Sequence, residues 1–151
     1  MKKIVLYITI MVCFGYSVFA QSKDLKGSQL AIRNSIQSYL KSEGFQPEID
    51  DDGDIKFKRQ GGTYFVSVSA TDENPVFVQL NKYFKYGDEL TQTKLVLFSM
   101  DNNYKACKIR PLKEMYIISG EFFIHNASAF TSVFYRILNV MDTIETSINE
   151  I

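Results

Sequence analysis

Residues 45–80 read FQPEIDDDGDIKFKRQGGTYFVSVSATDENPVFVQL, and this stretch decides the fold class. Runs in which apolar and polar residues alternate are separated by short groups of turn-forming residues, at 51–54, 59–62 and 71–74. Tight turns between runs with a period of two are typical of an antiparallel β-meander. We therefore predict four strands in this region, joined by turns.

Alternation within these strands predicts that one face of the sheet is buried and the other is partly exposed to water. Ile55 and Phe57, for example, alternate with Lys56 and Lys58.

The flanking segments predict three helices and two further strands. A first helix follows a proposed N-cap at Ser28 and ends at Gly44, whose freedom to adopt a positive φ suits a helix C-terminus. A second helix is predicted at 88–102, after an aromatic and basic loop at 81–89. Strands at 104–110 and 115–124 follow, with Pro111 in their connection.

The last helix begins after Asn126 and shows the clearest apolar stripe in the chain. The stripe consists of Phe130, Val133, Phe134, Ile137, Leu138, Met141, Ile144, Ile148 and Ile151. It is suited to packing on the sheet or across the axis of a dimer. The predicted order is α-β-β-β-β-α-β-β-α, which indicates an α+β domain with an antiparallel sheet and helices packed on it.

The N-terminus has the pattern of a secretory signal peptide. Lys2 and Lys3 precede an uncharged segment at 4–20, and we expect cleavage before Gln21. An uncleaved anchor is an alternative, although the segment is shorter than the roughly 20 apolar residues that span a bilayer. Lipidation at Cys13 is another alternative.

We accordingly divide the chain into a signal peptide at 1–20, a flexible tail at 21–27 and a single α+β domain at 28–151. Cleavage leaves 15 of the 17 basic residues against 17 acidic ones, a net charge of about −2. This balance argues against nucleic-acid binding, which requires a basic surface. We expect a periplasmic or secreted bacterial protein with no stable membrane anchor after cleavage.

Residues 39–80 (YLKSEGFQPEIDDDGDIKFKRQGGTYFVSVSATDENPVFVQL), the segment NNYKACK at 102–108 and the closing amphipathic helix resemble the YbjN-type, type III secretion chaperone-like fold. The resemblance covers nearly all of the mature chain as a pattern of elements. It implies a two-layer α+β domain and a homodimer. In the secretion chaperones, that fold holds extended segments of client proteins.

No residue constellation in the sequence predicts catalysis, a metal or a cofactor. The acidic group at 50–54 has an EF-hand-like start, but Arg59 occupies the position where a bidentate glutamate is required, so we interpret the group as a hairpin turn. Cys107 and His125 are the alternative catalytic pair. The phase of Cys107 predicts a buried, structural thiol, and His125 falls at a strand-to-helix junction.

Aromatic residues are the best candidates for a binding site. Phe65 and Phe77 are out of phase with the core residues of their strands, and Tyr83, Phe84 and Tyr86 lie close together beside lysines. Aromatic and cationic side chains on a surface are frequent in binding hot spots. The alternative is that helices cover both faces of the sheet and that these rings belong to the core.

We therefore expect an exported, non-enzymatic binding module that recognises a protein or peptide partner through a sheet face or edge, including in a chaperone-like role. The alternatives are a carrier of a small hydrophobic ligand in a pocket at Tyr64, Val66 and Phe122, a small envelope enzyme using Cys107 and His125, or a structural subunit of an envelope assembly.

Overall fold

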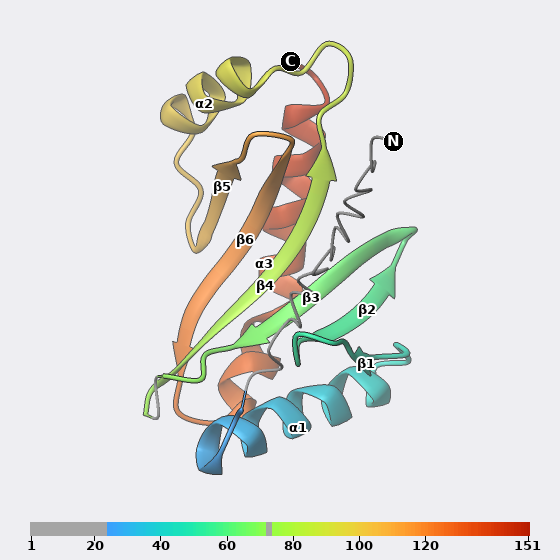
Figure 1. Ribbon diagram of the computed structural model, residues 1–151, viewed down its shortest axis with the longest axis vertical. Coiled ribbons are helices and arrows are strands. Elements are labelled where there is room, and N and C mark those ends of the chain that lie inside the picture. Colours follow the sequence, from blue (N-terminus) through green and yellow to red (C-terminus); the bar gives the residue numbers. More distant parts are fainter. Residues whose placement is uncertain (1–23, 72–73) are drawn as a thin grey trace, which may run out of the picture.

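The computed structural model describes residues 24–71 and 74–151 (Figure 1). The predicted signal peptide at 1–20 lies outside the described residues. The described chain forms one six-stranded antiparallel sheet and three helices, which confirms the α+β class and the antiparallel sheet. Helices and strands follow one another in the predicted succession, although several of them differ from the prediction in their bounds.

The order of the strands across the sheet is β1-β2-β3-β4-β6-β5. Every neighbouring pair is antiparallel. The elements are α1 (Gly27–Ser42), β1 (Glu48–Ile49), β2 (Ile55–Arg59), β3 (Gly62–Val68), β4 (Val76–Lys85), α2 (Gln92–Asp101), β5 (Cys107–Pro111), β6 (Met115–Ile124) and α3 (Ala127–Ile148).

Helix α1 begins earlier than predicted. Its N-cap is Lys26 and not Ser28, and the backbone N–H of Lys26 donates to Oε1 of Gln29 (3.3 Å). Leu25 is buried in the core, although the sequence placed it in a flexible tail at 21–27. Burial of this apolar side chain anchors the chain before the helix, so the domain begins before residue 28.

Two predicted turns have the expected backbone. Gly44 follows the C-cap of α1 with φ of 88°, a conformation that costs glycine little. Gln60 and Gly61 have φ of 49° and 78° and connect Arg59 to its partner Gly62. Positive φ at both central residues is the mark of a type I′ turn, which matches the twist of a β-hairpin.

Strand β4 is longer than predicted, because β6 gives it hydrogen-bonding partners as far as the pair Lys85 and Met115. The first half of the segment at 81–89 is therefore strand and not loop. Helix α2 begins later than the predicted residue 88. Its N-cap is Thr91, whose Oγ1 accepts a hydrogen bond from the N–H of Lys94 (3.2 Å).

Strand β5 is shifted toward the C-terminus relative to the prediction. Ala106 has φ of 62°, and regular pairing begins only at Cys107. Pro111 lies within the strand and not in the connection. Proline is tolerated here because β5 is an edge strand.

The core lies between the sheet and the helices α1 and α3. Figure 1 shows α3 running behind the sheet and α1 crossing its lower end. Gly120 allows close packing of β6 on α3, because an added Cβ would lie 2.3 Å from Cγ2 of Ile137. Most of the predicted stripe of α3 packs into this core, through Phe130, Phe134, Ile137, Leu138, Met141, Ile144 and Ile148. Val133 is only partly buried against the core, and Ile151 lies beyond the end of α3 and is 44% exposed.

Candidate binding face

The second face of the sheet has no helix over it within the described residues (Figure 1). We call this surface the open face. Because successive side chains of a strand point to opposite faces, the register defines its members. They are Glu48, Lys56, Lys58, Thr63, Phe65, Ser67, Phe77, Gln79, Asn81, Tyr83, Lys85, Lys108, Arg110, Met115, Ile117, Ser119, Glu121 and Phe123.

Two pairs of aromatic rings lie on the open face. Phe65 and Tyr83 meet edge to face with their centroids 5.4 Å apart, and Phe77 and Phe123 lie 4.9 Å apart. Phe123 is 61% exposed and Tyr83 is 45% exposed. Burial and the nearby carboxylate of Asp54 raise the pKa of Tyr83 above its ordinary value.

Between the two ring pairs the open face has a small polar centre. Asn81 and Ser119 are cross-strand partners and are 2% and 0% exposed. Oγ of Ser119 donates to Oδ1 of Asn81 (2.6 Å), so the buried polar groups satisfy each other. Ile117 lies next to this pair on the same face and is also buried, apart from the main core.

Charged groups lie beside the aromatic pairs. The ammonium group of Lys108 forms an ion pair with Glu121, and Nε2 of Gln79 donates to the same carboxylate (3.2 Å). Ser67 donates to Asp54 at the other side of the face. The open face therefore combines large apolar rings with polar groups that are held in place.

The structure separates the five predicted binding residues into two groups. Phe65, Phe77 and Tyr83 lie on the open face. Phe84 points the other way and stacks on Tyr116, with centroids 4.9 Å apart and ring planes within 8°. Tyr86 packs against the same tyrosine and donates to the carbonyl of Leu112 (2.9 Å), so neither residue belongs to the open face.

The sequence analysis did not identify Phe123 or the pair Asn81 and Ser119. Phe122 and Phe123 are adjacent, so one of them had to face away from the core once the phase of β6 was fixed. Phe122 packs on Phe130 of α3, which leaves Phe123 on the open face. The signal was therefore present in the strand alternation, whereas the polar pair depends on the cross-strand register.

Cys107 and His125 do not lie together. Cys107 pairs with Gly120, and His125 follows the last residue of β6, so about five residues, or roughly 17 Å of strand, separate their positions. Burial raises the pKa of the Cys107 thiol to about 11, which disfavours the nucleophilic thiolate. His125 is exposed, and its Nδ1 lies 2.6 Å from Oδ1 of Asn74.

The residues suggested for a carrier pocket are part of the packed core. Tyr64 and Val66 are 1% and 0% exposed, and the ring of Tyr64 stacks on Phe57 at 5.4 Å. Phe122, the third residue, packs on α3. The structure therefore does not bring the three residues together around one pocket: Tyr64 and Val66 are packed in the core, whereas Phe122 also lines a separate pocket of about 320 Å³ beside Phe77 and Cys107.

The acidic segment at 50–54 is a hairpin turn, as predicted. Oδ1 of Asp50 accepts hydrogen bonds from the backbone N–H groups of Asp52 (3.1 Å) and Asp54 (2.9 Å), and Gly53 has φ of 81°. Across the residues that the structure describes, no group of three or more His, Cys, Asp or Glu side chains is arranged to hold a metal ion.

Comparison with known proteins gives no family for this chain: no family model matches it, and no curated protein matches it in a sequence search. The described residues include no helix that is both long enough and apolar enough to cross a bilayer.

Proposed function

We propose that this protein is an exported, non-enzymatic binding module that recognises a protein or peptide partner through the open face and the adjoining edge of its sheet. The observation that carries this proposal is the presence of two aromatic pairs on the face that α1 and α3 leave uncovered. Tyrosine and phenylalanine rings surrounded by charged groups are typical of protein interfaces.

Two parts of the proposal rest on the sequence. The charged start and uncharged segment at 1–20 support export to the periplasm or the exterior. The resemblance to secretion chaperones supports a homodimer and a chaperone-like role. Sedimentation equilibrium of the purified protein measures the mass directly, and a monomer at all concentrations would remove the homodimer from the proposal.

The binding role is tested by affinity capture from envelope extract, with the protein expressed from its complete sequence as bait. The open-face variant is Phe77→Ala/Phe123→Ala. The matched control is Leu97→Ala/Met100→Ala, which removes two apolar side chains of α2 that are 57% and 75% exposed.

We expect a stoichiometric partner to be captured by the wild type and by the α2 control, and to be lost from the open-face variant. Truncation of a central aromatic anchor typically weakens an interface by 2 kcal/mol or more, which is about 30-fold. Equal capture by all three proteins would show that the open face is not the binding surface.

A further inference from the structure

The outer edge of β2 is only partly covered by β1. Glu48 and Ile49 pair with Lys56 and Ile55. Beyond them, the segment at 57–59 pairs with β3 on one side and with no described strand on the other. Unpaired strand edges of this kind are the surfaces to which extended peptides add.

The register shows that Lys58 presents its backbone to this free edge. The two-residue turn makes Arg59 and Gly62 a hydrogen-bonded pair, and bonded and non-bonded pairs alternate along an antiparallel ladder. The N–H and C=O of Lys58 therefore point away from β3. The hydrogen bond next to β1 leads to the same conclusion. The N–H of Asp50 donates to the carbonyl of Asp54 (3.0 Å), so the backbone of Asp54 faces the side of β1. Lys58 lies four residues further along the chain, and because orientations alternate, its backbone faces that side too.

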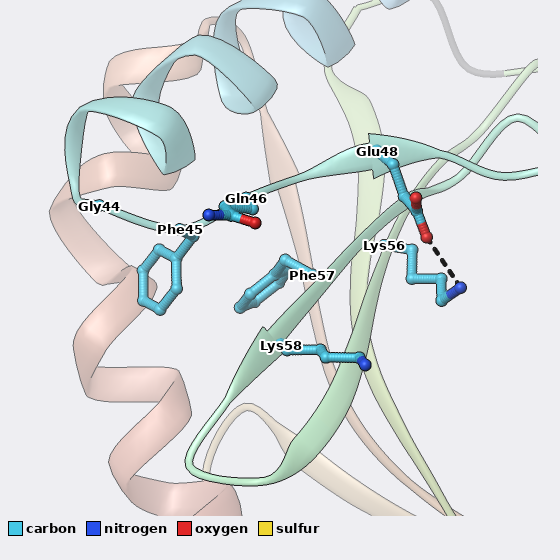
Figure 2. Close-up of a pocket in the computed structure, with 7 residues that line it drawn as sticks. All are labelled: Gly44, Phe45, Gln46, Glu48, Lys56, Phe57 and Lys58. Carbon is cyan, nitrogen blue, oxygen red and sulfur yellow. Dashed lines mark ion pairs between the residues drawn. The ribbon is translucent and has the colours of Figure 1, made fainter.

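The chain before β1 leaves space beside Lys58. The N–H of Phe45 donates to the carbonyl of Leu40 (3.0 Å), which holds this segment at the end of α1, and the ladder of β1 with β2 reaches only Glu48. A pocket of about 410 Å³ remains between the connection at 44–46 and β2 (Figure 2).

The two sides of this pocket differ in chemistry. On the core side, the rings of Phe45 and Phe57 lie with centroids 5.2 Å apart. On the open-face side are the ammonium groups of Lys56 and Lys58 (Figure 2). Lys56 is paired with Glu48 (2.8 Å), whereas no carboxylate of the described chain lies within 4.0 Å of the ammonium group of Lys58.

Strand β1 shows which pattern this edge accepts. Glu48 lies opposite Lys56 and neutralises it, and the next residue, Ile49, is apolar. One ladder step further, Lys58 has the same charge and the same backbone orientation as Lys56, but within the described residues it forms no ion pair and interacts with Glu48 only at longer range. Opposite charges at directly facing positions of an antiparallel pair are favourable.

We propose that the free edge of β2 binds an extended peptide segment that adds antiparallel to it, with an acidic residue opposite Lys58 and an apolar residue on each side of that acid. The acidic side chain lies on the open face beside Lys58, and the apolar side chains lie against Phe45 and Phe57. This inference rests on the proposed function and deepens it, because it states the chemistry of the partner segment.

The test is an NMR titration of the isotopically labelled full-length protein with two capped pentapeptides. The probe STVEV carries the predicted pattern and ends opposite Phe57, short of the positions that β1 occupies, and STVKV is identical except for the charged residue. We expect STVEV to shift the amide resonances of 57–59 and to bind at least tenfold more tightly than STVKV.

Two variants test the ion pair and the backbone contact separately. Lys58→Glu should reverse the preference, so that STVKV binds more tightly than STVEV. Lys58→Pro removes the outward N–H, which β3 does not use, and should abolish binding of both peptides. Lys58 is exposed, so Lys58→Glu is expected to keep the wild-type spectrum outside the edge.

Equal affinity of the two peptides, absence of binding, or an unchanged preference in Lys58→Glu would overturn the inference. None of these results would decide the outcome of the capture experiment, because that experiment tests Phe77 and Phe123 on the open face. Loss of the partner from the open-face variant together with no peptide binding would therefore refute the edge site alone. Peptide binding without capture would instead support the edge site and count against the open face.

Discussion

The two faces of strand β6 differ although they belong to the same ten residues. Toward α3, Tyr116, Ile118 and Ile124 are at most 3% exposed and lie in the core. Toward the open face, the same strand carries Ser119, Glu121 and the largely exposed Phe123. Because side chains alternate along a strand, neighbouring positions face opposite sides of the sheet, and toward the open face the burial of Ile117 and Ser119 gives way to exposure at Phe123.

Under the proposed function, stability and recognition are divided between the two faces of the sheet. Apolar side chains on the covered face lose contact with water on folding, which stabilises the domain by roughly 25 cal/mol per Å² of apolar surface. The exposed rings of the open face contribute less to folding, and their apolar surface stays available to a partner. Substitutions at alternate positions should therefore separate the two properties.

The largest effect is expected at Phe134, in the centre of the covered face. Its ring is 0% exposed and contacts the rings of Tyr39, Phe45, Phe57 and Phe130. Phe134→Ala removes these contacts and leaves a cavity, so we expect the free energy of unfolding to fall by about 3–5 kcal/mol. Urea denaturation followed by circular dichroism measures this change.

The matched control is the same substitution on the open face. Phe123→Ala should change the free energy of unfolding by less than about 1 kcal/mol, because the ring is 61% exposed. If the free energy of unfolding fell as much as in Phe134→Ala, the open face would be covered in the folded protein. The difference between the two faces described above would then be wrong.

Local patterns in the sequence were sufficient to predict the fold class. The predicted bounds of β6 are those observed, and α3 begins directly after its N-cap Asn126, whose side chain accepts from the N–H of Ala129 (3.2 Å). Errors occurred where a tertiary partner decides the outcome. The length of β4 depends on β6, and no local signal at 81–85 shows that such a partner exists.

The candidate site was predicted only in part, for a similar reason. The phase of Phe65 and Phe77 within their strands was enough to place them away from the core. Phe84 and Tyr86 fall in a segment without clear periodicity, and their contact with Tyr116 arises from the pairing of β4 with β6. The polar pair of Asn81 and Ser119 requires the same long-range register.

The covered face should also protect the thiol of Cys107, which is 4% exposed and whose pKa burial raises to about 11 from 9.0. At about pH 8 the thiolate fraction is then roughly 100-fold lower in the folded protein than in the unfolded chain. We expect alkylation by iodoacetamide to be slower by at least this factor without denaturant. Rates that differ by less than tenfold would place Cys107 outside the core.

The same shift predicts a dependence of stability on pH. The folded pKa of Cys107 lies above the unfolded one, so the unfolded chain releases its proton first as the pH rises. The contribution of the buried thiol is therefore complete below about pH 9 and is lost progressively toward about pH 11. In Cys107→Ala, the free energy of unfolding should fall less between about pH 9 and about pH 11 than in the wild type. Identical dependences of the free energy of unfolding on pH in the two proteins would contradict the prediction.

An effect smaller than that of Phe134→Ala is expected at the polar centre of the open face. Ser119→Ala removes the donor to Oδ1 of Asn81 and leaves a buried acceptor unpaired, so the free energy of unfolding should fall by about 1–3 kcal/mol. Asn81→Leu should also be destabilising, because it removes the acceptor and leaves the buried hydroxyl of Ser119 without its partner.

The double variant removes both polar groups of this pair, and we expect it to be more stable than the sum of the two single changes predicts. Additive losses in this double-mutant cycle, measured by urea denaturation, would mean that the two side chains do not depend on each other.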